Sequence, residues 1–326
     1  MTAGTLVRAG RGPGGTWETV LTLPHPRLRP GVINYRGIRL ALDRPRRRLE
    51  APTGTVTLLL GFDRPIRISR AGRPPKTLLS VFAGLATVPA IGEHDGRLAG
   101  IEVLLTPWAS FSLLGIPQHE LTGLHCDPDE LPHALDSSRR QSIGELAATL
   151  AALPSWAERF RLLDDVLVRW TEAGTPASAR VVRAWSTLAR SGGAIPVPLL
   201  ADEVGWSVRQ LESRFREQIG VGPKAAARIL RLQRARRLLS AGRSQAETAA
   251  ACGFYDQAHL SGEFRAMTGC TPGEFIAARL GEAAPASGPP LMDRLRGEAT
   301  SLVLSPDRGA DFSKTGRVRA MQGGAS

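Results

Sequence analysis

The sequence predicts an α+β protein in which a strand-rich N-terminal domain, completed by helices, precedes an all-α domain. Three observations support this. The chain has 326 residues, enough for about two domains of ordinary size. Short apolar segments separated by turn residues dominate up to Thr106, as in strands. Helical periodicity begins after Pro107 and continues to Arg279. A hydrophobic content of 42% supplies a core for both parts.

The first domain is predicted to span residues 16–173, after a glycine-rich N-terminus, 1–15, that we expect to be disordered. Alternating side chains around Val56 indicate a strand buried on at least one face. The basic runs 44–48 and 73–76 are interpreted as solvated turns, and a nucleic-acid contact is the alternative. The expected strands are Thr16–Leu23, Gly37–Leu42, Thr55–Gly61, Ile66–Ser69, Leu78–Phe82 and Gly100–Thr106.

Three helices are predicted to complete this domain, over 108–114, 143–153 and 155–172. Gly174 then marks the boundary of a second domain, 174–280. Its first helix is expected to begin with Thr175 as N-cap and Pro176 at the first helical position. Beyond it, residues 281–326 are rich in Ala, Gly, Pro and Ser and are expected to form a flexible tail.

The second domain contains an internal repeat with an offset of about 49 residues. Leu200–Pro223 and Thr248–Pro272 share a glycine, a leucine, a phenylalanine, a second glycine and a proline in the same order. In each copy an apolar helix ends at a glycine, a capping residue starts the next helix, and Leu and Phe four residues apart face inward. This pattern predicts two helix-turn-helix units, at about 198–220 and 245–269, joined by a linker helix over 224–239.

These residues resemble the DNA-binding domain of the AraC/XylS family over roughly 176–280. The resemblance rests on LADEVGWS, RLQRARRLL and TAAACGFYDQAHLSGEFRAMTGCTPGEF. It implies a sequence-specific transcription regulator that binds double-stranded DNA, works with RNA polymerase, is located in the cytoplasm and needs no cofactor. Formally the chain carries a charge of +12, but residues 195–282 hold 12 basic and 9 acidic side chains, so charge supports DNA binding only weakly.

The resemblance also identifies residues expected to face DNA. In the first unit Arg209 suits guanine, Gln210 suits adenine, and Arg216 suits a phosphate. The second unit departs from the family at Ala258 and Gly262, which offer no polar contact, so it is expected to read fewer bases. The full predicted set is Ser207, Arg209, Gln210, Glu212, Ser213, Arg216, Gln257, His259, Ser261 and Arg265.

The N-terminal domain resembles a cupin-like effector domain through Leu104–Gly123. This implies a small-molecule effector or a homodimer interface. No His-x-His pair is present, and His119, His125 and Asp127 are the nearest approach to a metal site, so no metal is expected. We see no catalytic signature, secretory signal or stretch long enough to cross a membrane.

Two alternatives from other classes stay open. The chain could be a DNA-repair enzyme fused to an AraC-like module. That interpretation requires a cysteine-rich zinc site in the N-terminal part, which Cys126 alone cannot supply. The N-terminal domain could instead be only an oligomerisation platform, which size-exclusion mass with and without metabolites would distinguish from a sensor.

Overall fold

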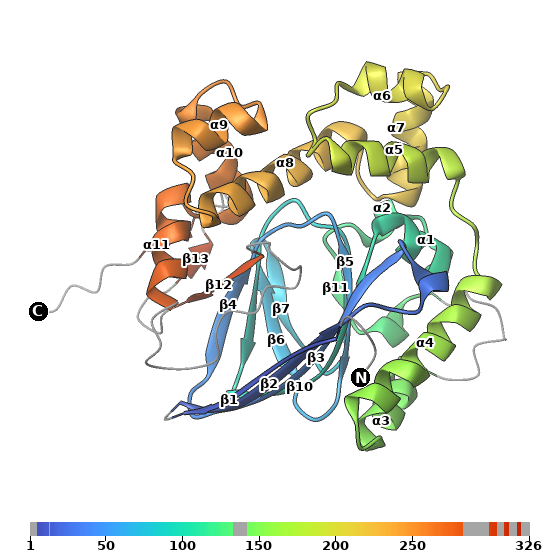
Figure 1. Cartoon of the computed structure of the whole chain (residues 1–326), viewed down its shortest axis with the longest axis vertical. Coiled ribbons are helices and arrows are strands. Elements are labelled where there is room, and N and C mark those ends of the chain that lie inside the picture. The colour runs from blue at the N-terminus through green and yellow to red at the C-terminus, as the bar shows by residue number, and fades with distance from the viewer. Residues whose placement is uncertain are drawn as a thin grey trace, which may run out of the picture.

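The structure is a computed structural model that describes residues 5–12, 14–132, 142–282, 300–304, 310–312 and 318–320. Its N-terminal part holds a seven-stranded antiparallel sheet in the order β1-β2-β3-β10-β5-β8-β11 (Figure 1). We call it sheet A. Its strands are β1 Leu6–Gly12, β2 Gly15–Thr22, β3 Val32–Leu42, β5 Val56–Gly61, β8 Val81–Ala83, β10 Arg97–Leu105 and β11 His125–Cys126.

A second antiparallel sheet, sheet B, has the order β12-β4-β9-β6-β7. Its strands are β4 Arg46–Glu50, β6 Ile66–Arg70, β7 Arg73–Leu78, β9 Ala90–His94 and β12 Ser301–Leu304. Four of them come from the first hundred residues, whereas β12 comes from near the C-terminus. A separate pair, β13 Ala310–Phe312 and β14 Val318–Ala320, forms a two-stranded sheet.

Strand β5 shows how the layers are arranged. Val56, Leu58 and Leu60 pack into an apolar cluster with the helices that cover sheet A. Leu59, on the other face, packs with Ile68 of sheet B. The strand is buried on both faces, and the N-terminal domain has three layers: helices, sheet A and sheet B. The covering elements are η1 Pro26–Leu28, α1 Pro107–Leu114, α2 Gln118–Leu121, η2 Pro128–Glu130, α3 Ile143–Ala152 and α4 Trp156–Ala173.

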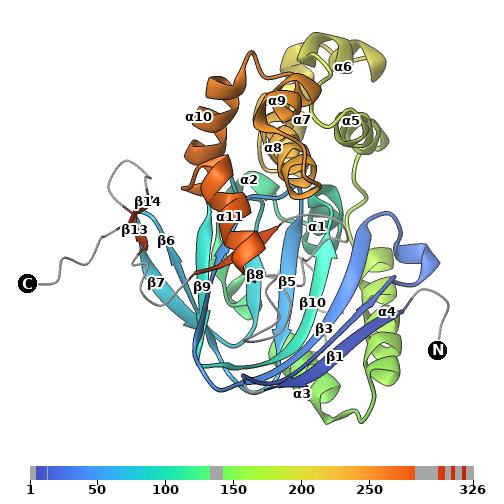
Figure 2. The ribbon, with the colours of Figure 1, turned by 60° about the vertical axis from the view of Figure 1, so that its left-hand side comes forward.

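The C-terminal domain is helical and lies across one end of the two sheets (Figure 2). Two short helix pairs, α6–α7 and α9–α10, stand at opposite ends of the long helix α8, so the predicted pair of helix-turn-helix units is present. The helices are α5 Ala179–Arg190, α6 Val197–Glu203, α7 Val208–Gln218, α8 Pro223–Ser240, α9 Gln245–Cys252, α10 Gln257–Thr268 and α11 Pro272–Glu282.

Several local expectations were wrong. Leu6–Gly12 is strand β1 rather than disordered chain, since it pairs along its length with β2; residues 1–4 and 13 lie outside the described residues. The basic runs 44–48 and 73–76 were taken as solvated turns, but β4 and β7 include most of their residues. They are strands at or near the edge of sheet B, where charged side chains on the solvent face are tolerated.

Two further expectations fail near the ends of the helical domain. Thr175 and Pro176 do not start a helix: α5 begins at Ala179 with Ser178 as its N-cap. The tail 281–326 is not wholly without structure, because Ser301–Leu304 pairs with β4. The rest of that tail lies outside the described residues, apart from the end of α11, Thr300, β13 and β14.

One apolar cluster joins the two domains. Leu49 of β4, Ile91 of β9 and Leu302 of β12 belong to the same buried cluster as the core of the helical domain, including Phe215 and Phe264. The loop after β4 also contacts the helical domain, because the Gly54 amide donates to the Gln233 side chain on α8 at 3.1 Å. The helical domain therefore rests on sheet B through side-chain packing.

Candidate nucleic-acid interface

The turn of each helix-turn-helix unit is formed by a glycine in the left-handed region. Gly205 has φ +66° and Gly253 has φ +70°, conformations that side-chain-bearing residues rarely adopt. The next helix then starts at a side-chain cap: Ser207 accepts the Gln210 amide, and Asp256 accepts the His259 amide. These turns and caps are the ones predicted from the repeat.

Helix α7 is the recognition helix of the first unit. Leu211 and Phe215 are fully buried and fix its inner face. Because successive residues are 100° apart, the outermost row opposite this face is formed by Arg209, Ser213 and Arg216. All three side chains are exposed, as is the predicted Glu212 on the flank. The first unit thus presents two guanidinium groups and a hydroxyl at the positions suited to enter a groove of DNA.

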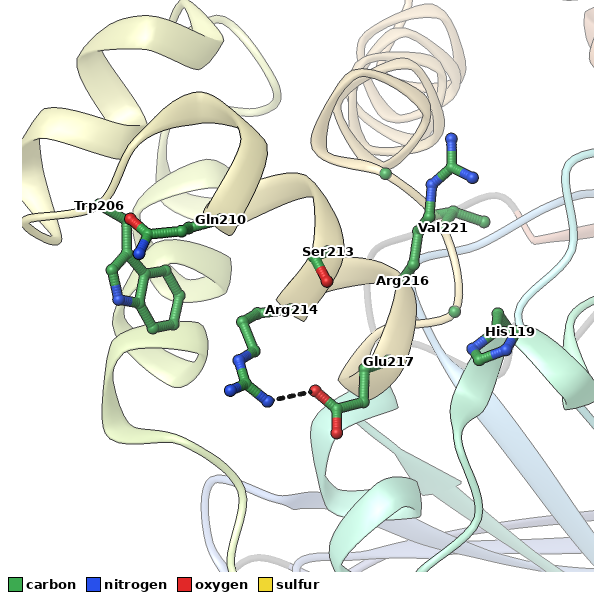
Figure 3. Close-up of a pocket in the computed structure, with 10 residues that line it drawn as sticks. His119, Trp206, Gln210, Ser213, Arg214, Arg216, Glu217 and Val221 are labelled. Atoms are coloured by element: carbon green, nitrogen blue, oxygen red, sulfur yellow. Dashed lines mark hydrogen bonds and ion pairs between the residues drawn. The ribbon is translucent and has the colours of Figure 1, made fainter.

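A groove of about 1010 Å³ runs beside α7, and Figure 3 shows the residues that line it. Arg214 donates to Glu217 at 2.8 Å, which holds these two side chains against each other along the helix. His119 of α2 lies beyond the C-terminal end of α7 and also lines the groove. Helix α2 is fixed there because the Thr122 hydroxyl donates to the Gly220 carbonyl at 2.8 Å. The N-terminal domain therefore contributes to the edge of this surface.

Two of the predicted DNA contacts in the first unit are occupied by a helix cap. Ser207 and Gln210 form a capping box: the Ser207 amide and hydroxyl both donate to Gln210 Oε1, at 3.0 and 3.2 Å. Gln210 keeps its Nε2 donor but not a free carbonyl oxygen. A bidentate pair with adenine would need both groups, so Gln210 can contact a base through one hydrogen bond while the box is intact.

Helix α10 is the recognition helix of the second unit, and its outward row has one polar side chain. Leu260 and Phe264 are fully buried and define its inner face. Opposite them stand Ala258, Gly262 and Arg265, the counterparts of Arg209, Ser213 and Arg216, and the first two cannot donate or accept through their side chains. The departures noted in the sequence therefore coincide with the centre of the exposed face.

The other polar residues of α10 lie on the flanks of that row. The Gln257 side chain donates to Gln245 Oε1 of α9 at 3.3 Å, and the Ser261 hydroxyl approaches the same oxygen at 3.5 Å. Both point back toward α9. The ring of His259 accepts the Tyr255 amide at Nδ1, which places its proton on Nε2. Arg265 is exposed and is the one polar side chain of the outward row itself, at the position that Arg216 has in α7.

Helix α8 joins the units over 18 residues, about 27 Å at the α-helical rise. Arg228 on this helix makes two hydrogen bonds to Glu263 of α10, and Arg231 lies 5.6 Å from the centroid of the Phe254 ring. Arg236 on the same helix is fully buried. Arg228 and Arg231 therefore attach the second unit to the linker helix.

The structure also contains a cavity of about 90 Å³ between sheets A and B. It is lined by a buried ion pair, Arg36 with Glu102, and by Arg48 and His94 of sheet B. The Gly96 amide donates to His94 Nδ1 at 3.2 Å, so the ring proton is on Nε2. Among the residues that the structure describes, this buried Nε2 has no hydrogen-bond partner. Burial and nearby Arg46 and Arg48 lower the pKa of His94 to about 4, which keeps the ring neutral.

The residues considered for a metal site or for cysteine chemistry lie in different parts of the structure. His125 lines the inter-sheet cavity, whereas His119 lies at the groove beside α7, so these two histidines belong to different sites. Within the described ranges no three His, Cys, Asp or Glu side chains are grouped as metal ligands. Burial raises the pKa of the Cys126 thiol to about 11, so it is protonated at neutral pH.

Sequence reasoning missed the residues that attach elements to one another. His119 and Thr122 come from the N-terminal domain, and no pattern in the helical repeat points to them. The pair of Arg228 with Glu263 was also missed, because pairing across 35 residues has no local signal. Among the described helices, none is long and apolar enough to cross a membrane.

Comparison with known proteins shows which proteins the helical domain is similar to. The family described as "Helix-turn-helix domain" matches residues 200–278. A transcriptional regulator with an AraC-type DNA-binding domain from Chromobacterium violaceum is 33% identical; the match covers 33% of this chain and 95% of that chain, with a TM-score of 0.30. The C-terminal domain of AraT from Geobacillus stearothermophilus is 18% identical, covering 37% and 98%, with a TM-score of 0.30.

ToxT from Vibrio cholerae is similar over more of the chain, covering 74% of this chain and 98% of ToxT at 10% identity and a TM-score of 0.44. A comparison with curated proteins gives no match. The family is shown by the regulator from C. violaceum, because the match covers 95% of that chain at 33% identity. The chain therefore belongs to the AraC/XylS family of transcription regulators.

Proposed function

We propose that this regulator binds promoter DNA through both helix-turn-helix units, with α7 as the principal reader of bases and α10 mainly as a contact to the backbone. The observation that carries this proposal is the difference between the two outward rows. Arg209, Ser213 and Arg216 on α7 can donate to base edges and phosphates, whereas α10 presents Ala258, Gly262 and Arg265 at the corresponding positions, so only Arg265 can donate there.

The linker helix supports simultaneous binding by the two units. Successive major grooves on one face of B-form DNA are about 34 Å apart. A helix of about 27 Å with a recognition helix beyond each end is of the size needed to span that repeat. Arg228 and Arg231 attach the second unit to α8, so the spacing between the units is set by packing.

The experiment is a fluorescence-anisotropy titration of the full chain with its own upstream intergenic DNA and with a scrambled fragment, at about 150 mM salt. We expect specific binding to be about 10³-fold tighter or more. The affinity for both fragments should fall steeply as salt increases, because phosphate contacts release counterions. Equal affinity for the two fragments would contradict sequence-specific recognition.

We further propose that the cavity between the sheets receives a small polar effector. Its support is chemical: His94 Nε2 carries a proton, is buried, and has no protein acceptor, while Arg48 and the Arg36–Glu102 pair line the same space. A ligand with an acceptor oxygen would satisfy His94. Thermal shifts with a library of small acids and polyols, repeated on His94→Phe, test this; a hit that is retained by His94→Phe would contradict binding at this cavity.

RNA polymerase and a second copy of the chain are the remaining proposed partners, and both rest on the family. Mass measurement in solution at micromolar concentration, with and without an effector found as above, tests self-association. Transcription in vitro with purified polymerase would show whether the regulator activates or represses.

A further inference from the structure

The last strand of sheet B is supplied by the C-terminal segment 300–304, which we call the strap. Its strand β12 pairs antiparallel with β4, so that Leu302 stands opposite Leu49 and Ser301 opposite Glu50. The ladder continues by one bond, because the Ala51 amide donates to the Thr300 carbonyl at 3.0 Å. Arg48 of β4 also donates to the Ser301 hydroxyl. The strap is thus held by main chain and side chains together.

The same strap contacts the second helix-turn-helix unit. Arg279, near the end of α11, donates to the Ser301 carbonyl at 3.0 Å, and Figure 1 shows β12 between β4 and α11. Leu302 is 3% exposed and belongs to the cluster that contains Phe275 of α11. One short strand therefore has a face on the N-terminal domain and a face on the DNA-binding domain.

The strap gives the DNA-binding domain a further attachment to sheets A and B. One attachment is at its start, where the Ala177 amide donates to Ser112 of α1 and Thr122 holds Gly220. Another is on α8, where Gln233 accepts the Gly54 amide. The strap lies beside α11, at the far end of α8 (Figure 1). A domain attached at this end as well has less freedom to rotate than one attached only at its start and on α8.

The contacts of the strap leave the reading face of the second unit accessible. Ala258, Gly262 and Arg265 on α10 are exposed, and none of the bonds described for the strap involves α10. The strap therefore positions the second unit without covering the surface that would meet DNA. This distinguishes a positioning role from autoinhibition, in which the contact would bury that surface.

We propose that residues 300–304 position the second helix-turn-helix unit for DNA binding, by fixing α11 against sheet B so that α10 is already placed when α7 binds. This inference rests on the proposed binding of DNA by both units. Its physical basis is preorganisation: a unit with few base contacts gains from being placed in advance, since less freedom is lost on binding.

The test compares two shortened chains with the full chain. One ends at residue 299 and lacks the strap. The control ends at residue 304 and keeps it, so both lose residues 305–326. Each is titrated with the upstream DNA, and with the same fragment after the half contacted by the second unit has been scrambled. We expect loss of the strap to weaken binding to the intact fragment by about 10-fold and to the scrambled-half fragment by less than about twofold.

A second variant, Leu302→Asp in the full chain, removes the apolar contact without shortening the protein. Amide hydrogen exchange is measured on the same chains without DNA. Exchange in α9, α10 and α11 should accelerate in Leu302→Asp and in the chain that ends at residue 299, while exchange in α7 stays as in the control. Unchanged exchange and unchanged affinity would overturn the proposal, and tighter binding without the strap would show autoinhibition instead. Absence of specific binding by the full chain would refute the proposed function, whereas the exchange result would still decide the strap's hold on α11.

Discussion

Arg228 of the linker helix holds Glu263 of the second recognition helix through two hydrogen bonds, of 2.8 and 3.1 Å. The side chains are 45% and 29% exposed, so solvent screens the pair. We expect the cycle of Arg228→Ala, Glu263→Ala and the double variant to give a coupling of about 0.5–1 kcal/mol in urea unfolding. Strictly additive losses in that cycle would mean that the pair does not attach α10 to α8.

Arg209 stands in the outermost row of the first recognition helix. Arg209→Ala should weaken binding to the upstream DNA by about 1–3 kcal/mol and relax the preference at one base pair. Arg64→Ala, an exposed arginine of the N-terminal domain, is the control and should leave the affinity unchanged. If Arg209→Ala weakened binding to scrambled DNA by the same factor, Arg209 would contact phosphate only.

Ala258 occupies in α10 the place that Arg209 occupies in α7. Because Ala258 is exposed, Ala258→Arg should fold normally and add a donor to the reading row of the second unit. We expect a tighter complex by about 1 kcal/mol on fragments selected with a guanine at the position facing that residue. Selection of binding sites from a random pool measures this. A pool unchanged from that of the natural chain would argue against placement of α10 in the major groove.

Gln210 serves as both a cap and a predicted base contact. Gln210→Glu should keep the capping box, since a carboxylate accepts from Ser207 as the amide oxygen does. It also replaces the Nε2 donor by negative charge facing DNA. We expect stability within about 0.5 kcal/mol of the natural chain and at least about 10-fold weaker DNA binding. Ser207→Ala is the companion variant: it should cost about 1 kcal/mol of stability.

His94 makes the stability of the folded chain depend on pH. Its pKa in the folded chain is about 4, below the ordinary histidine value, so between about pH 6.5 and 4 the unfolded chain binds a proton that the folded chain does not. The free energy of unfolding is therefore unaffected by His94 above about pH 6.5. It falls as the pH is lowered, and the loss reaches about 3 kcal/mol at pH 4. Urea unfolding at pH 7.5 and 5.0 measures it, and His94→Gln should flatten the difference. A natural chain equally stable at both pH values would contradict the neutral ring.

The helical domain could be predicted closely because its signals are local. Ser207 and Asp256 start helices, Gly205 and Gly253 end them, and each acts through neighbours a few residues away. Strand β4 could not be predicted in this way. Its sequence RRRLE has one apolar side chain, Leu49, which pairs with Leu302 more than 250 residues later in the sequence. A strand with so little hydrophobic alternation is decided by long-range pairing, here with β9 and β12.

The candidate DNA contacts show the same limit. Helical periodicity placed Arg209, Ser213 and Arg216 on the exposed face of α7, as in the structure. Periodicity does not say what an exposed polar side chain bonds to. Gln257 and Ser261 turn back to Gln245 on α9, a contact that depends on how two helices cross. Whether these side chains reach DNA stays a prediction.

The small side chains on the outward row of α10 have a consequence for the promoter. If α7 contacts more bases than α10, the two halves of the operator are recognised differently. The half bound by α7 is recognised base by base, whereas the half bound by α10 is recognised by its groove width and flexibility. Point changes in the strict half would silence a target gene, while changes in the lenient half would only adjust its expression. A genome could then tune many promoters under this one regulator without altering the protein.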